Sequence, residues 1–383
     1  MDNLTHSFIG LAASKAGLER LSSGTTLLCV LAANAPDADI VTLVSGRWAY
    51  LQHHRGITHS IVGTFALALA LPLIFYLVDL LWARIRKGAP KVKLRGLLIA
   101  SILVSATHPL MDWTNNYGVR FLLPWNSQWF YGDLVFIIDP LLWMALGGSV
   151  FLLTSKTKLQ IVAWFALGLV TSYLVFFGPS DRGGLSNPIF LRAAWFSGLV
   201  ALVVLFMQQA GKRWGERIPI TAFAVVACYL AGLFFVHILA VRQAQFEAAT
   251  IAAQSNEQVI KVAAMPTLAN PLNWLVVAET DRAAYRFPMS LTGASRGSSV
   301  IRYEKPQGLS ARATGEASED SRAKVFLGFA RFPIVKVVGL DCATQTLVQF
   351  ADLRYTEPGR DRGTFSLELP VDCPATDVKP GSK

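Results

Sequence analysis

Residues 61–82 read IVGTFALALALPLIFYLVDLLW, with Asp79 as their single charged residue. A helix of about 20 predominantly apolar residues crosses the hydrocarbon core of a bilayer, so this stretch predicts a transmembrane helix. Two shorter apolar runs that contain polar residues precede it, and five long runs follow it. The fold class that we predict is therefore mainly α, a polytopic helical membrane bundle of about eight spans over residues 4–18, 25–44, 61–82, 94–111, 134–154, 159–177, 190–207 and 218–241.

The composition supports this fold class and argues against a soluble protein. Of the 383 residues, 53% are hydrophobic and only 16% are charged, with a mean hydropathy of +0.42. A soluble chain of this length needs more charge to cover its surface. The net charge is +10, but the basic residues lie in short loops between apolar runs, so we expect no nucleic acid partner. Because the N-terminus lacks a basic segment, we also expect no cleaved signal peptide.

The loop after residue 82 sets the predicted orientation. Residues 84–95 contain six lysines and arginines and no acid, and such loops face the cytoplasm. Alternation of the spans then places both termini outside. The sequence thus predicts a multi-pass protein of a bacterial inner membrane, in contact with the lipid bilayer.

A second domain is expected after the last span. From residue 242 the sequence becomes mixed in charge, and stretches such as 346–350 (TLVQF) and 364–369 (TFSLEL) are typical of strands. We expect a membrane domain over residues 1–241, a strand-rich extracytoplasmic domain over 242–374 that begins with a helical connector, and a disordered tail over 375–383. Cys342 and Cys373 could pair in an oxidising compartment, or their presence in one domain could be coincidence.

Polar residues that suit a metal ion recur near the ends of the first four predicted spans. In the predicted topology every one of these groups lies at the outer face, although the spans alternate in direction. His108 and Asp112 are four residues apart, so they share one face of a helix. Neutral imidazole and carboxylate are ligands that suit zinc or a similar divalent ion. The sequence therefore predicts a metal site with one or two ions, and its candidate ligands are His6, Asp37, His54, His59, His108 and Asp112.

Two carboxylates near residue 36 are also candidates for a catalytic role. Asp37 or Asp39 could orient the attacking water as a base. Three weaker candidates complete the predicted site, namely His53, Asp133 and Asp139. Asp139 could orient a ligand histidine or bind a second ion, or it could be an acid that favours a helix start.

The sequence resembles bacterial membrane-bound metal-dependent hydrolases, described as inner-membrane-associated hydrolases of the LexA-binding type. The resemblance is strongest over residues 1–145, the predicted core of the membrane domain. It is carried by Thr5-His6, by the strings PDAD (36–39), HRGITHS (54–60) and HPLMD (108–112), and by IDP (138–140). It implies a distant similarity to zinc-dependent phospholipases C and single-strand nucleases, which cleave phosphoesters. This chain has fewer histidines than those proteins, so one or two ions are expected rather than three.

Three functions are compatible with these residues. The first is a metal-dependent hydrolase that acts on a phosphoester at the outer membrane face, for example a lipid head group. The second is an ion transporter, although a transport path needs polar groups near the middle of the membrane. The third is a non-catalytic membrane scaffold with a structural metal. The sequence does not identify the oligomeric state.

Overall fold

The computed structural model describes residues 1–177, 188–293, 300–339, 346–361 and 363–372. Cys342, Cys373 and the predicted tail lie outside these described residues. The chain divides into two compact units. The first unit contains residues 1–39, 55–239 and 266–274, and the second contains residues 40–54, 240–265 and 275–383.

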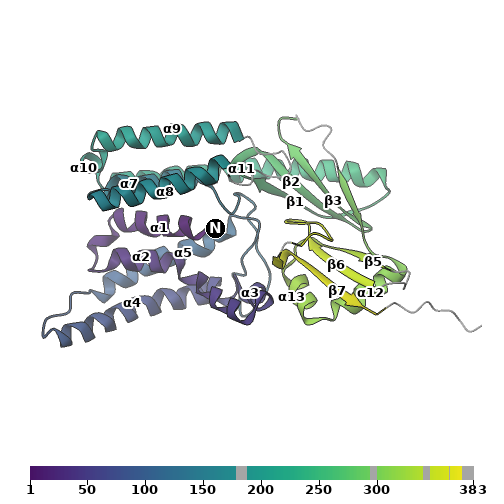
Figure 1. Cartoon of the computed structure of the whole chain (residues 1–383), viewed down its shortest axis with the longest axis horizontal. Helices are drawn as coiled ribbons and strands as arrows, with labels where there is room; N and C mark the ends of the chain where they lie inside the picture. Colours follow the sequence, from purple (N-terminus) through teal and green to yellow (C-terminus); the bar gives the residue numbers. More distant parts are fainter. Residues whose placement is uncertain (178–187, 294–299, 340–345, 362, 373–383) are drawn as a thin grey trace, which may run out of the picture. The chain divides into compact units, whose positions relative to one another are not determined.

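The first unit is helical (Figure 1). Its longest helices carry apolar side chains on their exposed faces, as expected for helices that are surrounded by hydrocarbon; Phe65 is 53% exposed and Phe165 is 67% exposed. The helical elements of this unit are α1 (Asn3–Lys15), α2 (Thr25–Asn34), α4 (Ile61–Ile85), α5 (Leu94–Trp113), α6 (Pro140–Leu142), α7 (Gly148–Thr154), α8 (Lys158–Phe177), α9 (Pro188–Met207) and α10 (Ala210–Trp214), with short 3-10 or π-helical turns between some of them.

Six helices of the described chain are long and apolar enough to cross a membrane. The mainly helical membrane fold with a strand-rich C-terminal region is thus confirmed, but the predicted number of about eight spans is not. The first predicted span is the 13-residue α1, which is only about 20 Å long against a core of about 30 Å. The fifth predicted span was expected to begin at residue 134, but its helix begins only at Pro140, where Asp139 is the N-cap. The apolar helical segment therefore covers only Pro140–Thr154.

Small residues allow the helices around the predicted site to pack closely. Cys29, Ala32 and Ala33 of α2 form one buried cluster with Ala100 and Val104 of α5. Gly10 of α1 lies so close to α2 that an added Cβ would stand 2.5 Å from the backbone oxygen of Cys29. Small residues at such contacts are typical of helix packing in membranes. This packing brings α1, α2 and α5 into mutual contact around the predicted site.

The last apolar helix continues without interruption past the predicted domain boundary. α11 (Arg217–Gln254) passes through residues 241 and 242 and contributes to both units. The first strand follows it after four residues, so the predicted helical connector is the distal part of this long helix.

The second unit contains most of the strands. The four-stranded sheet has the order β1-β2-β3-β4 and the three-stranded antiparallel sheet has the order β5-β6-β7. Both strands predicted by sequence pattern are present, as β6 and β7. Helix α3 (Arg47–His53) packs on α13 in this unit. The remaining elements are β1 (Val259–Thr267), β2 (Asn270–Thr280), β3 (Ala283–Ser290), β4 (Ile301–Glu304), α12 (Gly308–Ser318), α13 (Ser321–Phe329), β5 (Pro333–Val338), β6 (Thr346–Asp352) and β7 (Ser366–Val371).

Candidate metal centre

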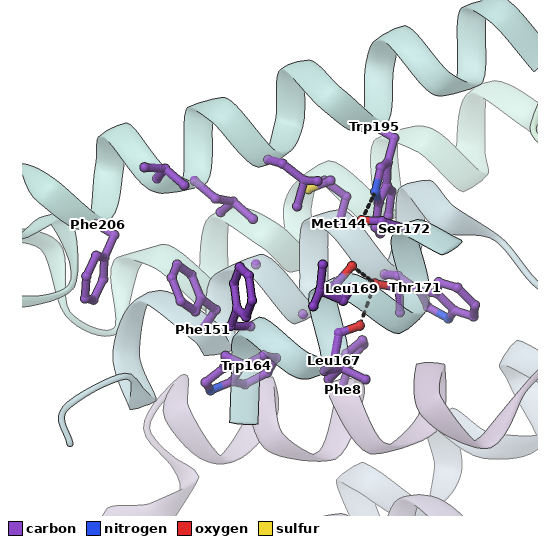
Figure 2. A pocket seen from close by; sticks show the side chains of 18 of the residues that line it. Phe8, Met144, Phe151, Trp164, Leu167, Leu169, Thr171, Ser172, Trp195 and Phe206 are labelled. Carbon is purple, nitrogen blue, oxygen red and sulfur yellow. Dashed lines mark hydrogen bonds between the residues drawn. The ribbon is translucent and has the colours of Figure 1, made fainter. Parts of the chain in front are cut away.

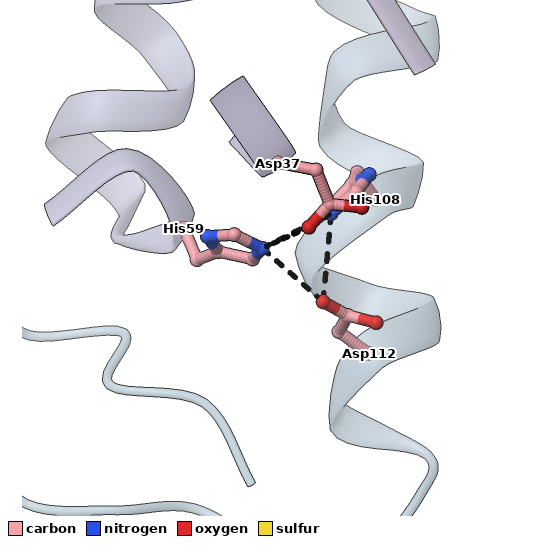
Figure 3. Close-up of side chains that lie close together, drawn as sticks. All are labelled: Asp37, His59, His108 and Asp112. Atoms are coloured by element: carbon pink, nitrogen blue, oxygen red, sulfur yellow. Dashed lines mark hydrogen bonds and ion pairs between the residues drawn. The ribbon is translucent and has the colours of Figure 1, made fainter. Parts of the chain in front are cut away.

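Four side chains from three separate segments of the first unit point toward one another (Figure 3). Asp37 follows α2, His59 ends the short turn η3 (Ile57–His59), and His108 and Asp112 lie one turn apart near the end of α5. His59, His108 and Asp112 are fully buried, and the side chain of Asp37 is 19% exposed. The structure thus brings together residues that are up to 75 positions apart in the chain.

The distances between the four inward-facing atoms match those expected between ligands of one metal ion. We call the four residues Asp37, His59, His108 and Asp112 the cage. The two histidine Nε2 atoms are 3.1 Å apart. Nε2 of His59 lies 3.2 Å from Oδ1 of Asp37 and 3.3 Å from Oδ2 of Asp112, and the corresponding distances from Nε2 of His108 are 3.5 and 3.4 Å. Ligands held at 2.0–2.2 Å by one tetrahedral ion would be separated by about 3.3 Å. The spacing therefore fits a single ion at the centre.

Outer partners orient both histidine rings toward this centre. Nδ1 of His108 lies 2.6 Å from the backbone oxygen of Ala33, which can only accept a hydrogen bond. Nδ1 of His108 is therefore the protonated nitrogen, and its Nε2 presents a lone pair to the cage. Nδ1 of His59 lies 3.4 Å from Oδ2 of Asp39, which favours the same tautomer. This arrangement of a carboxylate or carbonyl behind a histidine is typical of metal sites.

The two carboxylates of the cage are held in the same way. Arg55 donates from Nη2 to Oδ1 of Asp112 at 2.9 Å, and the Met1 amino group also contacts this oxygen. Asn3 donates from Nδ2 to Oδ2 of Asp37 at 2.8 Å. In each case one carboxylate oxygen is engaged from outside and the other faces the cage.

The charges and lone pairs of the cage also favour a cation. With neutral histidines, the three carboxylates of Asp37, Asp39 and Asp112 outnumber the two cationic groups, Arg55 and the Met1 amino group, so a net negative charge remains for a cation to offset. Two Nε2 lone pairs that face each other at 3.1 Å repel unless a proton or a cation lies between them. Buried charge is costly unless it is paired or bound to a metal.

His6 lies directly against the cage. Its ring stacks on that of His108 with centroids 3.8 Å apart, and its Nε2 is 3.4 Å from Oδ1 of Asp112. The ring is fully buried, and neither of its nitrogens has a hydrogen-bond partner in the described part of the chain. His6 therefore lies beside the cage, next to the Asp112 oxygen that Arg55 and the Met1 amino group also contact.

The local sequence explains the position of His59. Ser60 caps α4 by accepting a hydrogen bond from the backbone N–H of Gly63, and the turn that carries His59 folds back onto this first helical turn. An added Cβ at Gly63 would stand 1.7 Å from the backbone oxygen of Ile57, so only glycine permits this approach. The string HRGITHS with Gly63 therefore forms a compact turn that presents His59 to α5.

The other predicted site residues are not among the four that form the cage. His53 and His54 belong to the second unit, where His53 is exposed at the end of α3 and the ring of His54 stacks on Tyr50. Asp139 caps α6 with one oxygen and accepts a hydrogen bond from Tyr229 at 2.8 Å with the other. Asp133 is buried in the loop before α6 and has a φ of 52°.

Sequence reasoning missed Arg55 and Asn3, which hold the cage carboxylates. By sequence, Arg55 is only one residue of the string HRGITHS (54–60). It is 4% exposed, donates to Asp112 and Asn115, and its guanidinium lies over the ring of Tyr117. A buried arginine needs such partners, but nothing in the sequence marks Arg55 as buried.

The fold and the site together define a polytopic membrane protein with a buried His/Asp cage. Residues 1–184 match the family described as YdjM inner membrane protein. The chain is also 26% identical over 153 residues to the uncharacterized protein YfhP of Bacillus subtilis (strain 168). This similarity covers 38% of the chain and 44% of the relative, so the chain spans less than half of the length of that protein. No solved structure matches the chain. The matches support a membrane location and name no activity.

Proposed function

We propose that this protein is a membrane-embedded metal-dependent hydrolase that acts on a phosphoester. The metal is a divalent ion, and zinc suits the nitrogen and oxygen ligands and the tetrahedral spacing best. The observation that carries the proposal is the pair of Nε2 atoms of His59 and His108, 3.1 Å apart and flanked by carboxylate oxygens of Asp37 and Asp112.

A bound ion would lower the pKa of a coordinated water and polarise the phosphoryl group of the substrate. The residues of the chain would do the rest. His59, His108 and Asp112 would hold the ion, and Arg55 would orient the Asp112 carboxylate through its hydrogen bond to Oδ1. Asp37 has the most exposed side chain of the four, so it would form the side by which substrate enters and would accept the proton of the attacking water.

A lipid head group is the substrate that best suits the setting. The helices that carry the cage pack among exposed apolar helices, which would keep the protein within the bilayer. His108 and Asp112 lie near the end of α5 and His59 lies just before the start of α4, so the centre would be near the level of the head groups. The positive-inside pattern of residues 84–95 would place this end at the outer face of the membrane.

A structural metal is the second candidate function, and one observation favours it. Four protein ligands would fill the tetrahedral coordination of zinc, and closed sites of this kind are typically structural. Catalysis requires that one position opens to water, and Asp37 is the ligand that could leave it. The two functions therefore differ in what they require of Asp37.

Metal analysis of the purified full-length protein tests the site. We expect about one equivalent of zinc in the wild type and none above background in His59→Ala, because the cage would lose a ligand. His237→Ala removes a histidine that packs on Trp274 in the same unit, and it should retain the metal. Equal metal content in His59→Ala and the wild type would contradict the proposal.

Hydrolysis by Asp37→Asn distinguishes the two functions. A catalytic Asp37 predicts that this variant retains metal but loses about 10²–10⁴-fold in rate, which is the range for a general base. The assays would use bis(p-nitrophenyl) phosphate and phospholipid vesicles. A zinc-loaded wild type that hydrolyses neither probe would favour the structural metal.

A further inference from the structure

We propose that a cavity in the side of the first unit binds one acyl chain of a bilayer phospholipid. The cavity has a volume of about 420 Å³ and lies among α7, α8, α9 and the π-helical turn η4 (Trp143–Gly147) (Figure 2). Phe8 of α1 closes one wall, and Phe151 and Phe206 lie together at one end. This site is separate from the metal cage, and the proposal does not depend on the proposed hydrolase activity.

The chemistry of the wall excludes water and favours hydrocarbon. The polar side chains along it bond to the protein: Trp195 donates from Nε1 to Ser172 Oγ at 2.9 Å, and Thr171 donates to the Leu167 oxygen at 2.9 Å. A water in a cavity needs two to four polar partners. The remaining wall is apolar, so an apolar occupant would replace no hydrogen bonds on entry.

The cavity opens toward the surface that faces the bilayer. Phe165, Leu169 and Val203 line it and are 67%, 57% and 54% exposed. These residues lie on helices with the length and hydropathy of membrane spans. The molecules that meet this opening are therefore lipids or other membrane helices.

The size of the cavity selects a lipid chain over a helix. A helix with its side chains is about 10 Å wide, so 420 Å³ would hold only about 5 Å of its length, or one turn. A single flexible hydrocarbon chain has no such limit. Pockets of 300–1,000 Å³ are typical of small ligands.

The backbone geometry keeps the cavity open. The π-helical turn η4 widens the helix at one wall, and π-helical turns are frequent at functional sites. On α8, which also lines the cavity, a Cβ added at Gly168 would meet no atom within 4 Å. The cage lies across α1 from this cavity, because His6 and Phe8 are two residues apart and so point about 200° apart around the helix.

Photolabelling of the full-length protein tests the proposal. The protein would be reconstituted in vesicles of phosphatidylethanolamine and phosphatidylglycerol that contain a trace of phosphatidylethanolamine with a diazirine in its acyl chain. After illumination, mass spectrometry locates the labelled residues. We expect labelling of Met144, Phe151 and Leu199 to exceed that of Ile74 and Leu81, which are exposed on α4 but line no cavity described here.

A filling variant and a matched control make the test specific. Gly168→Phe should reduce labelling of the cavity about tenfold, because the new ring would occupy the site of the chain. Gly232→Phe adds the same ring to α11, where a Cβ also meets no atom within 4 Å, and should leave cavity labelling unchanged. Equal loss in both variants, or wild-type labelling spread evenly over the exposed residues of α4, α8 and α9, would overturn the proposal. If Gly168→Phe does not fold, the wild-type pattern alone decides.

Discussion

The two units of this protein each bury a carboxylate, but they neutralise it differently. In the second unit, Asp352 and Arg354 are both fully buried, and the arginine donates from Nε and Nη2 to the same carboxylate at 2.9 and 2.7 Å. The guanidinium also lies over the rings of Phe329 and Tyr355. In the first unit, Arg55 contacts one oxygen of Asp112, and the other oxygen faces two histidines.

This difference shows which of the two clusters is electrostatically complete. Asp352 and Arg354 balance each other, and backbone N–H groups of Arg331 and Arg354 satisfy the remaining lone pairs. The cage gathers acceptors: the Nε2 atoms of His59 and His108 and one carboxylate oxygen each of Asp37 and Asp112 lie within 4.8 Å of one another. The first arrangement is typical of a structural ion pair, and the second is typical of a site for a cation.

The largest effect is expected when the buried pair of Asp352 and Arg354 is broken. Arg354→Met should destabilise the second unit by about 3–5 kcal/mol, because it leaves Asp352 buried without a partner. Metal content should not change. The double variant Asp352→Asn with Arg354→Met should be less destabilised than the single variant, as measured by urea unfolding. If Arg354→Met is as stable as the double variant, Asp352 does not need Arg354 to neutralise its charge, and the prediction is wrong.

Removal of metal should destabilise the first unit, which carries the cage, and should leave the second unit unaffected. At a free zinc concentration about a thousandfold above its dissociation constant, the ion would stabilise the first unit by about 4 kcal/mol. A chelator should therefore lower the thermal midpoint of the wild type. It should leave that of His59→Ala unchanged, since this variant has no ion to lose. A chelator effect of the same size in both proteins would contradict the cage.

Substitution of Asp39, which lies behind the ring of His59, should weaken metal binding without abolishing it. Asp39→Asn removes the charge that lies 3.4 Å from Nδ1 of His59, and outer partners of this kind affect affinity by about 10–100-fold. Competition with a chromogenic chelator would measure the change. Asp79→Asn is the matched control, because Asp79 instead accepts hydrogen bonds from the backbone of Lys91 and Val92. Equal affinities in the two variants would remove Asp39 from the site.

The smallest expected effect lies in the second unit and depends on pH. Asp320 caps α13, and hydrogen bonds from Arg322 lower the pKa of Asp320 to about 2. Because this pKa lies below the ordinary value of 3.8, the cap stabilises the fold above pH 4 and loses its effect as the pH falls toward 2. Asp320→Ala should cost about 1 kcal/mol at pH 7 and almost nothing at pH 2. A cost that is the same at both values would exclude a charged cap.

The first and the fifth predicted spans show where sequence patterns were insufficient. The apolar run near the N-terminus predicted a span, but the helix that forms there has 13 residues, too few to cross a bilayer. The run from residue 134 also appeared continuous, yet the segment before Pro140 is not helical. Hydropathy records how apolar a segment is but does not record where capping side chains such as Asp139 start a helix.

The sequence by itself determined the membrane class, the strand-rich C-terminal region and the types of residue that a metal site would use. These depend on local features: the length of apolar runs, alternation of side chains, and the i, i+4 spacing of His108 and Asp112. Only the tertiary structure decided which candidates converge. His54 and His59 are equally good ligands by sequence, and it is His59 that the structure places with His108, with the two Nε2 atoms 3.1 Å apart. The physical reason is that a cage needs atoms from distant segments within about 4 Å of each other, and only helix packing sets such distances.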